Sequence, residues 1–97
     1  MMILITYDVC TTTLEGKKRL RHVAKTCLNF GQRAQNSVFE CLVTPDEWVN
    51  LKSQLLNIYN KDADSLRFYQ LGTKWQRRVE HYGVKDVFDL QNDTLLI

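Results

Sequence analysis

The pattern of apolar and polar positions begins with an almost uninterrupted apolar, β-rich run over residues 2–9, in which Asp8 is the only acidic residue. Strands with one face in water alternate apolar and polar residues, whereas continuous apolar runs are typical of strands covered on both faces. The run therefore predicts a central strand with Asp8 at its carboxyl end, where chemistry in sheet proteins is often placed. An aspartate after a strand is more often a turn or capping residue, so Asp8 indicates catalysis only together with other groups.

Two helices are predicted by apolar residues that recur every three to four positions. The first stripe comprises Leu20, Val23, Ala24, Cys27 and Leu28, and the second comprises Trp48, Leu51 and Leu55. A capping box of Thr12 with Glu15 is expected to begin the first helix, and Gly31 to end it in the left-handed conformation. Thr44 is expected to cap the second helix, with Pro45 at the first helical position and Glu47 completing another capping box.

The remaining segments of residues 1–72 have the features of strands. We expect a short strand near Arg33, a bend at Asn36 and a second strand over 38–43, and then a last strand over 65–71. The order strand, helix, strand, strand, helix, strand predicts an α+β, ferredoxin-like β-α-β-β-α-β sandwich. Two helices cover only one face of such a sheet, so an apolar first strand indicates self-association into a homodimer through the other face.

Residues 73–97 are predicted to form a tail that completes a dimer. This segment is too apolar for a disordered tail, and it ends in three aliphatic residues. We expect an extra C-terminal strand that docks on the sheet edge or on a partner subunit. At 97 residues the whole chain is a single domain.

Composition narrows the class of protein. The chain is 44% hydrophobic and 25% charged, as expected of a globular domain, and no transmembrane span or secretory signal is predicted. Three cysteines without C-x-x-C spacing indicate neither a disulfide framework nor a zinc site, so buried free thiols in a reducing cytoplasm are expected. The chain has no glycine-rich phosphate loop and no inferable Ser–His–Asp group.

The first predicted helix concentrates positive charge. Its polar faces carry Lys17, Lys18, Arg19, Arg21, His22 and Lys25, and no acidic residue occurs from position 17 to position 35. Such a surface is either an ordinary solvated helix face or a binding surface for an anionic ligand. The absence of nearby carboxylates favours the anionic ligand.

Three segments together resemble the Cas2 family of small CRISPR-associated proteins, which partner the CRISPR integrase. They are Thr6-Tyr7-Asp8 on the first strand, Lys18-Arg19-Leu20-Arg21 on the first helix, and Arg33-x-Gln35-x-Ser37-Val38-Phe39-Glu40 after it. The resemblance implies a homodimer whose two first-strand aspartates face each other across a cleft. Asp8 matches the catalytic and metal-binding position, for Mg²⁺ or Mn²⁺. Positions implicated in activity or nucleic-acid contact are matched by Tyr7, Arg19, Arg21, Arg33, Ser37 and Phe39.

Two functions are compatible with this resemblance. One is a metal-dependent endonuclease that cleaves phosphodiester bonds of double-stranded DNA, with RNA as a second candidate substrate and with activity that is weak or pH-dependent. The other is a non-catalytic DNA-binding scaffold for the integrase during spacer acquisition. An RNA-recognition-motif domain shares the fold, but the central strands lack its aromatic-rich signature. The same fold also occurs in small-molecule regulatory domains, so fold alone does not decide function.

Overall fold

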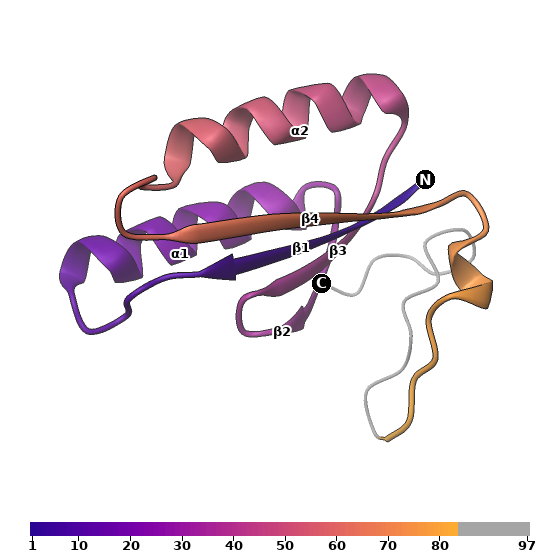
Figure 1. The fold of residues 1–97 in the computed structure, drawn as a ribbon, viewed down its shortest axis with the longest axis horizontal. Coiled ribbons are helices and arrows are strands. Elements are labelled where there is room, and N and C mark those ends of the chain that lie inside the picture. The colour runs from indigo at the N-terminus through magenta and orange to yellow at the C-terminus, as the bar shows by residue number, and fades with distance from the viewer. Residues whose placement is uncertain (84–97) are drawn as a thin grey trace.

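The computed structural model describes residues 1–83 and has the predicted ferredoxin-like order (Figure 1). The elements are β1 (Met2–Asp8), α1 (Leu14–Leu28), β2 (Gly31–Gln35), β3 (Val38–Leu42), α2 (Pro45–Ile58), β4 (Ser65–Gly72) and the 3-10 helix η1 (Trp75–Arg77). The predicted extra strand near the carboxyl end lies outside the described residues. The boundary at residue 72 and the docking of the tail therefore stay predictions.

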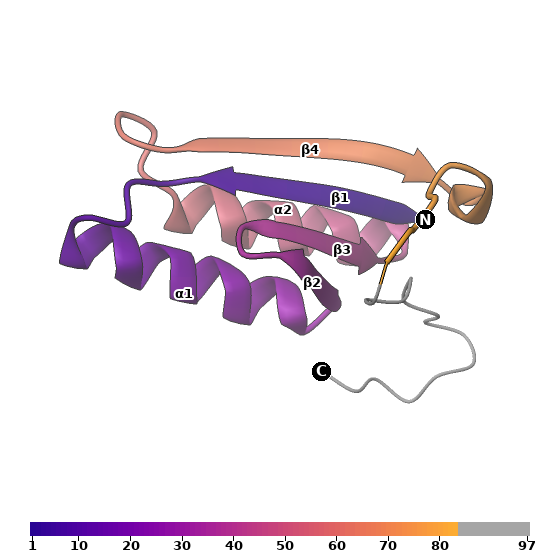
Figure 2. The ribbon, with the colours of Figure 1, turned by 90° about the horizontal axis from the view of Figure 1, so that it is seen from below.

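The four strands form one antiparallel sheet in the order β2-β3-β1-β4, which places β1 at the centre beside β3 and β4. Both helices lie on the same side of this sheet (Figures 1 and 2). Neither α1 nor α2 covers the opposite face (Figures 1 and 2). No helix in that part of the chain is long and apolar enough to cross a membrane.

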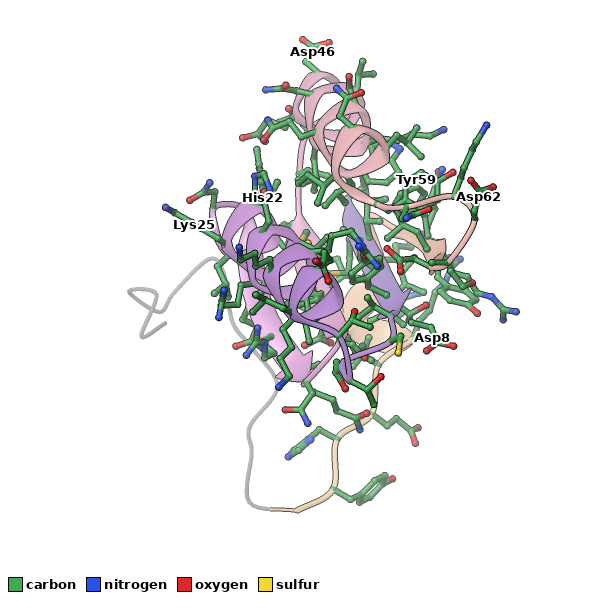
Figure 3. All side chains as sticks on the ribbon, turned by 90° about the vertical axis from the view of Figure 1, so that its left-hand side faces the viewer. Asp8, His22, Lys25, Asp46, Tyr59 and Asp62 are labelled. Atoms are coloured by element: carbon green, nitrogen blue, oxygen red, sulfur yellow. The ribbon has the colours of Figure 1, made fainter. Side chains whose placement is uncertain are left out.

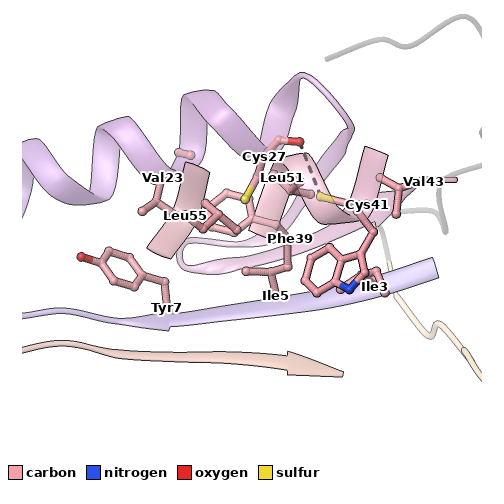
Figure 4. Close-up of a cluster of buried hydrophobic side chains, with 12 residues drawn as sticks. Ile3, Ile5, Tyr7, Val23, Cys27, Phe39, Cys41, Val43, Leu51 and Leu55 are labelled. Carbon is pink, nitrogen blue, oxygen red and sulfur yellow. Dashed lines mark hydrogen bonds between the residues drawn. The ribbon is translucent and has the colours of Figure 1, made fainter. Parts of the chain in front are cut away.

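Strand alternation decides which side chains enter the core. Ile3, Ile5 and Tyr7 of β1 are buried on the helix-covered side, whereas Leu4 and Thr6 point to the other face and are half-buried. The helix-covered side thus receives the predicted core residues, including Cys27 and Cys41 as free thiols (Figure 4). The helix stripes supply most of the remaining core, namely Val23, Ala24, Trp48, Leu51 and Leu55.

The start of α1 differs from the prediction by one residue. Thr13, not Thr12, is the N-cap, and its hydroxyl accepts a hydrogen bond of 3.0 Å from the backbone N–H of Gly16. With the cap at position 13, Glu15 lies one residue too early to complete a capping box. Thr12 instead contacts the Cys10 sulfur at 2.9 Å. The capping box at Thr44 is confirmed.

The predicted left-handed cap at Gly31 is also wrong. The helix ends at Leu28, its C-cap Asn29 is right-handed, and Gly31 is already the first residue of β2. The reason for a glycine here is close packing, since a Cβ atom on Gly31 would lie 1.9 Å from the carbonyl oxygen of Glu40 in β3. Gly31, as the first residue of a strand, therefore has a different role from the one that the helical pattern suggested.

Candidate functional site

The carboxyl end of β1 presents two neighbouring side chains to opposite sides of the sheet. Tyr7 turns into the core and is 1% exposed, while Asp8 is exposed to solvent. The backbone N–H of Tyr7 donates a 2.9 Å hydrogen bond to the carbonyl oxygen of Ser37. This bond holds the β2–β3 turn against the end of β1, next to Asp8.

A cleft of about 320 Å³ opens beside Asp8 and brings together five of the sequence-predicted site residues. They are Tyr7, Asp8, Arg21, Arg33 and Ser37, and the remaining lining residues are Val9, Thr11, Leu20 and Asn36. The charged groups come from three elements, because Asp8 ends β1, Arg21 lies on α1 and Arg33 lies on β2. Two guanidinium groups and one carboxylate therefore face the same space.

Arg33 is the most constrained of these groups. Its guanidinium carbon lies 5.4 Å from the centroid of the Phe39 ring, in a cation–π arrangement. Its Nε is buried and has no hydrogen-bond partner in the described part of the chain. Arg33 also lines the cleft, so its positive charge favours an incoming anionic group there. Because Phe39 is 0% exposed, the direct nucleic-acid contact predicted for it does not fit, and it supports Arg33 from the core.

Asp8 also lines a second cleft, of about 380 Å³, on the helix-free face of the sheet. The other residues around it include hydroxyl groups of Thr6, Ser37 and Ser65 and the guanidinium of Arg67. Arg67 was not predicted from the sequence, because only the register, in which Arg67 pairs with Thr6, brings it near Asp8. Among the described residues, Asp8 is the one carboxylate that lines either cleft.

Arg19 lies away from both clefts in a buried network that the sequence did not reveal. Its Nε and Nη2 donate to the two carboxylate oxygens of Asp64 at 2.8 and 3.0 Å, and the Asp64 side chain is 0% exposed. The Tyr7 hydroxyl also donates to Asp64, as does the backbone N–H of Asn60 at 3.0 Å. The network ties β1, α1 and the loop before β4 together.

These bonds change the acidity of the groups that make them. Burial opposes ionisation of Asp64, but the hydrogen bonds from Arg19, Tyr7 and the Asn60 backbone outweigh it and lower its pKa. Burial and the hydrogen bond to Asp64 raise the pKa of Tyr7 to about 12. Arg19 and Tyr7 thus have an internal anion as partner, and in this structure their polar groups are not directed at the cleft.

A metal ion at Asp8 would find few protein ligands among the described residues. The described residues contain no cluster of three or more His, Cys, Asp or Glu side chains that could hold one. Mg²⁺ is commonly held by one or two carboxylates and several waters. An exposed Asp8 at a strand end fits one such ligand, and no second carboxylate of the described residues lines the clefts beside it.

Fold and site together define a small ferredoxin-like protein with an aspartate at the end of its central strand and two arginines around an adjacent cleft. The family model for CRISPR associated protein Cas2 matches residues 1–79. The chain therefore belongs to the Cas2 family.

Relatives match the chain almost end to end. A protein of Chlorobaculum tepidum named CRISPR-associated endoribonuclease Cas2 is 56% identical over 96 residues, covering 99% of this chain and 100% of its own. A protein of Halalkalibacterium halodurans named CRISPR-associated endonuclease Cas2 is 50% identical over 92 residues, covering 95% and 96%. The crystal structure of Streptococcus pyogenes Cas2 at pH 6.5 has a TM-score of 0.78 and 61% identity, covering 86% of this chain and 100% of that one.

Proposed function

We propose that this protein is a divalent-metal-dependent endonuclease of CRISPR adaptation that acts as a homodimer on double-stranded DNA, with RNA as a second candidate substrate. The observation that carries the proposal is the cleft in which Asp8, Arg21 and Arg33 converge. Names of close relatives support a nuclease, since they include both an endonuclease and an endoribonuclease. The choice of double-stranded DNA rests on the resemblance stated above.

The roles of the cleft residues follow from their chemistry. Guanidinium groups bind two phosphate oxygens at once, so Arg21 and Arg33 are assigned to the phosphate group next to the bond that breaks. Arg33 is already ordered by Phe39 and by burial of its Nε, which lowers the entropic cost of binding. Ser37 closes the cleft through its backbone bond to Tyr7.

Asp8 is assigned as the metal ligand. When bound, Mg²⁺ or Mn²⁺ would supply Lewis-acid polarisation of a phosphate oxygen and a more acidic water. Two copies of Asp8 across a dimer axis would offer two carboxylates to one ion. The half-buried Leu4 and Thr6 on the helix-free face are consistent with a second copy packing there.

One observation favours the alternative of a non-catalytic scaffold that binds double-stranded DNA for the CRISPR integrase. In residues 1–83, no second carboxylate and no histidine line the two clefts beside Asp8, so these residues provide no evident general base. A scaffold needs the cations of the cleft but not a metal. The two functions therefore differ in what happens to the bound nucleic acid, not in whether it binds.

The deciding experiment uses the variant Asp8→Asn with purified full-length protein. Cleavage of a DNA duplex and of a single-stranded RNA is followed with Mg²⁺, with Mn²⁺ and with a chelator. The near-isosteric amide removes the charge of an exposed side chain, so fold and dimerisation should persist. Asp62→Asn, in the exposed loop after α2, is the matched control.

For a nuclease, we expect metal-dependent cleavage by the wild type and by Asp62→Asn, and loss of cleavage by Asp8→Asn with nucleic-acid binding retained. Cleavage that survives in a repurified Asp8→Asn protein would contradict the assignment of this site. Tight duplex binding without cleavage in any metal would establish the scaffold instead.

A further inference from the structure

The helix α1 separates two polar hollows. One is the Asp8 cleft, which Arg21 lines, and the other is a groove of about 430 Å³ between α1 and α2, which Lys18 and His22 line. Figure 3 shows His22 in the gap between the two helices and Asp8 beyond the opposite side of α1. Lys18 and His22 are four residues apart, so they lie one turn apart on the same side of the helix.

The lining of this groove has the chemistry of an oxyanion site. The α1 wall supplies Lys18, Arg19, His22 and Thr26, and the α2 wall supplies Gln54, Asn57 and Ile58. No carboxylate of the described residues belongs to this lining, and the α2 wall is uncharged. Ammonium, imidazole and amide groups all donate hydrogen bonds to phosphate oxygens.

The cationic side chains of the groove differ in whether a carboxylate already pairs with them. Arg19 is paired with Asp64 and so contributes little free charge. Lys18 and His22 are exposed, and neither makes a side-chain hydrogen bond or ion pair with another described residue. On the α2 wall, one amide hydrogen of Gln54 is used by Asn50 at 3.2 Å. The donors still available are therefore those of Lys18, His22, Asn57 and the second hydrogen of Gln54.

We infer that this groove binds a backbone phosphate of the nucleic acid, at a position separate from the Asp8 cleft. The inference rests on the proposed function in that it takes nucleic acid as the ligand. A strand held at both hollows passes over α1, whose exposed crest adds Lys25. A helix with its side chains is about 10–12 Å wide. That width exceeds the axial rise of one nucleotide, about 3.4 Å, so the two hollows are reached by different phosphates.

The test compares Lys18→Gln and His22→Ala with the control Lys52→Gln, an exposed lysine of α2 outside the groove. All three replaced side chains are exposed, so the folded state should be retained, as checked by circular dichroism. Affinity for a short DNA duplex is measured by fluorescence anisotropy between about 50 and 200 mM salt, a range over which phosphate contacts change affinity strongly.

We expect Lys18→Gln to reduce the slope of log affinity against log salt by about 0.9, the value for one lost phosphate contact. His22→Ala should weaken binding roughly 2- to 10-fold, as expected for one lost hydrogen bond. Lys52→Gln should leave both quantities unchanged. An unchanged slope for Lys18→Gln, or an equal loss for Lys52→Gln, would overturn the groove as a phosphate site.

A fourth variant separates this inference from the proposed function. Arg33→Gln changes the Asp8 cleft and leaves the groove intact. If Arg33→Gln loses affinity while the groove variants bind like the wild type, the groove inference is wrong and the cleft remains. If the groove variants lose affinity and Arg33→Gln does not, the phosphate contact in the cleft is wrong and the groove remains.

Discussion

The substitution Tyr7→Phe distinguishes a structural role of this tyrosine from a role in nucleic-acid contact. It removes only the hydroxyl group, which donates to the buried carboxylate of Asp64. The ring of Tyr7 is 1% exposed and packs in the core, so phenylalanine fills the same space without leaving a cavity. The change therefore isolates one hydrogen bond to one charged acceptor.

The magnitude follows from what Asp64 keeps. A hydrogen bond to a charged group contributes about 1.5–3 kcal/mol to stability. After the change, Asp64 still accepts from Arg19 at 2.8 and 3.0 Å and from the Asn60 backbone at 3.0 Å, so its charge is not left unpaired. We therefore expect a loss of about 2 kcal/mol in the free energy of unfolding. For a domain of this size that lowers Tm by about 8–16 °C.

Urea unfolding at a fixed protein concentration measures the loss, because self-association makes apparent stability depend on concentration. The control is Tyr69→Phe, whose hydroxyl is on an exposed residue and accepts from Arg67 at 3.4 Å. The control should stay within about 0.5 kcal/mol of the wild type. The same proteins are then titrated with DNA, and we expect Tyr7→Phe to keep the salt slope of the wild type. A stability like that of the wild type, or a reduced slope, would refute the structural role.

Two further predictions concern acid and packing. The pKa of Asp64 is lowered in the folded protein, so its network stabilises the fold fully above the unfolded-state pKa of about 3.9, and this stability is lost as pH falls toward the folded pKa. Acid unfolding should therefore be steeper for the wild type than for Asp64→Asn, and equal steepness would contradict the network. Gly31→Ala would place a Cβ atom 1.9 Å from the backbone oxygen of Glu40, so the free energy of unfolding should fall by about 1–3 kcal/mol. An unchanged midpoint of chemical unfolding would contradict this close packing of β2 on β3.

Much of the fold could be predicted because its signals are local. The apolar run of β1, the stripes of both helices and the capping box at Thr44 each depend on residues within a few positions of one another, and these elements are confirmed. The errors at Thr12 and Gly31 are also local. At the start of α1 the sequence has neighbouring threonines, and the structure uses Thr13 as the cap. At Gly31, a glycine is suited either to a helix end or to a close approach of two strands, and the structure shows the second.

The site could be predicted only in part, because it depends on contacts between distant residues. Asp8, Arg21 and Arg33 were identified through their resemblance to a family, and the structure brings them to one cleft. No periodicity indicates that Asp64, in a polar loop, is the buried partner of Arg19. That pairing requires the register of β4 on β1, and it gives Arg19 a structural partner where the sequence suggested a free cation.

The central position of β1 has a consequence for how the chain acquires its structure. This strand is the first to leave the ribosome, yet its two neighbours are β3 and β4, and Ile5 pairs with Phe39 on one side and with Phe68 on the other. Pairings between distant positions close late and slow the search for the native state. A nascent chain that ends after α2 would still hold its most apolar strand with one open edge. Completion of β4 is therefore the step that removes this aggregation-prone edge during synthesis.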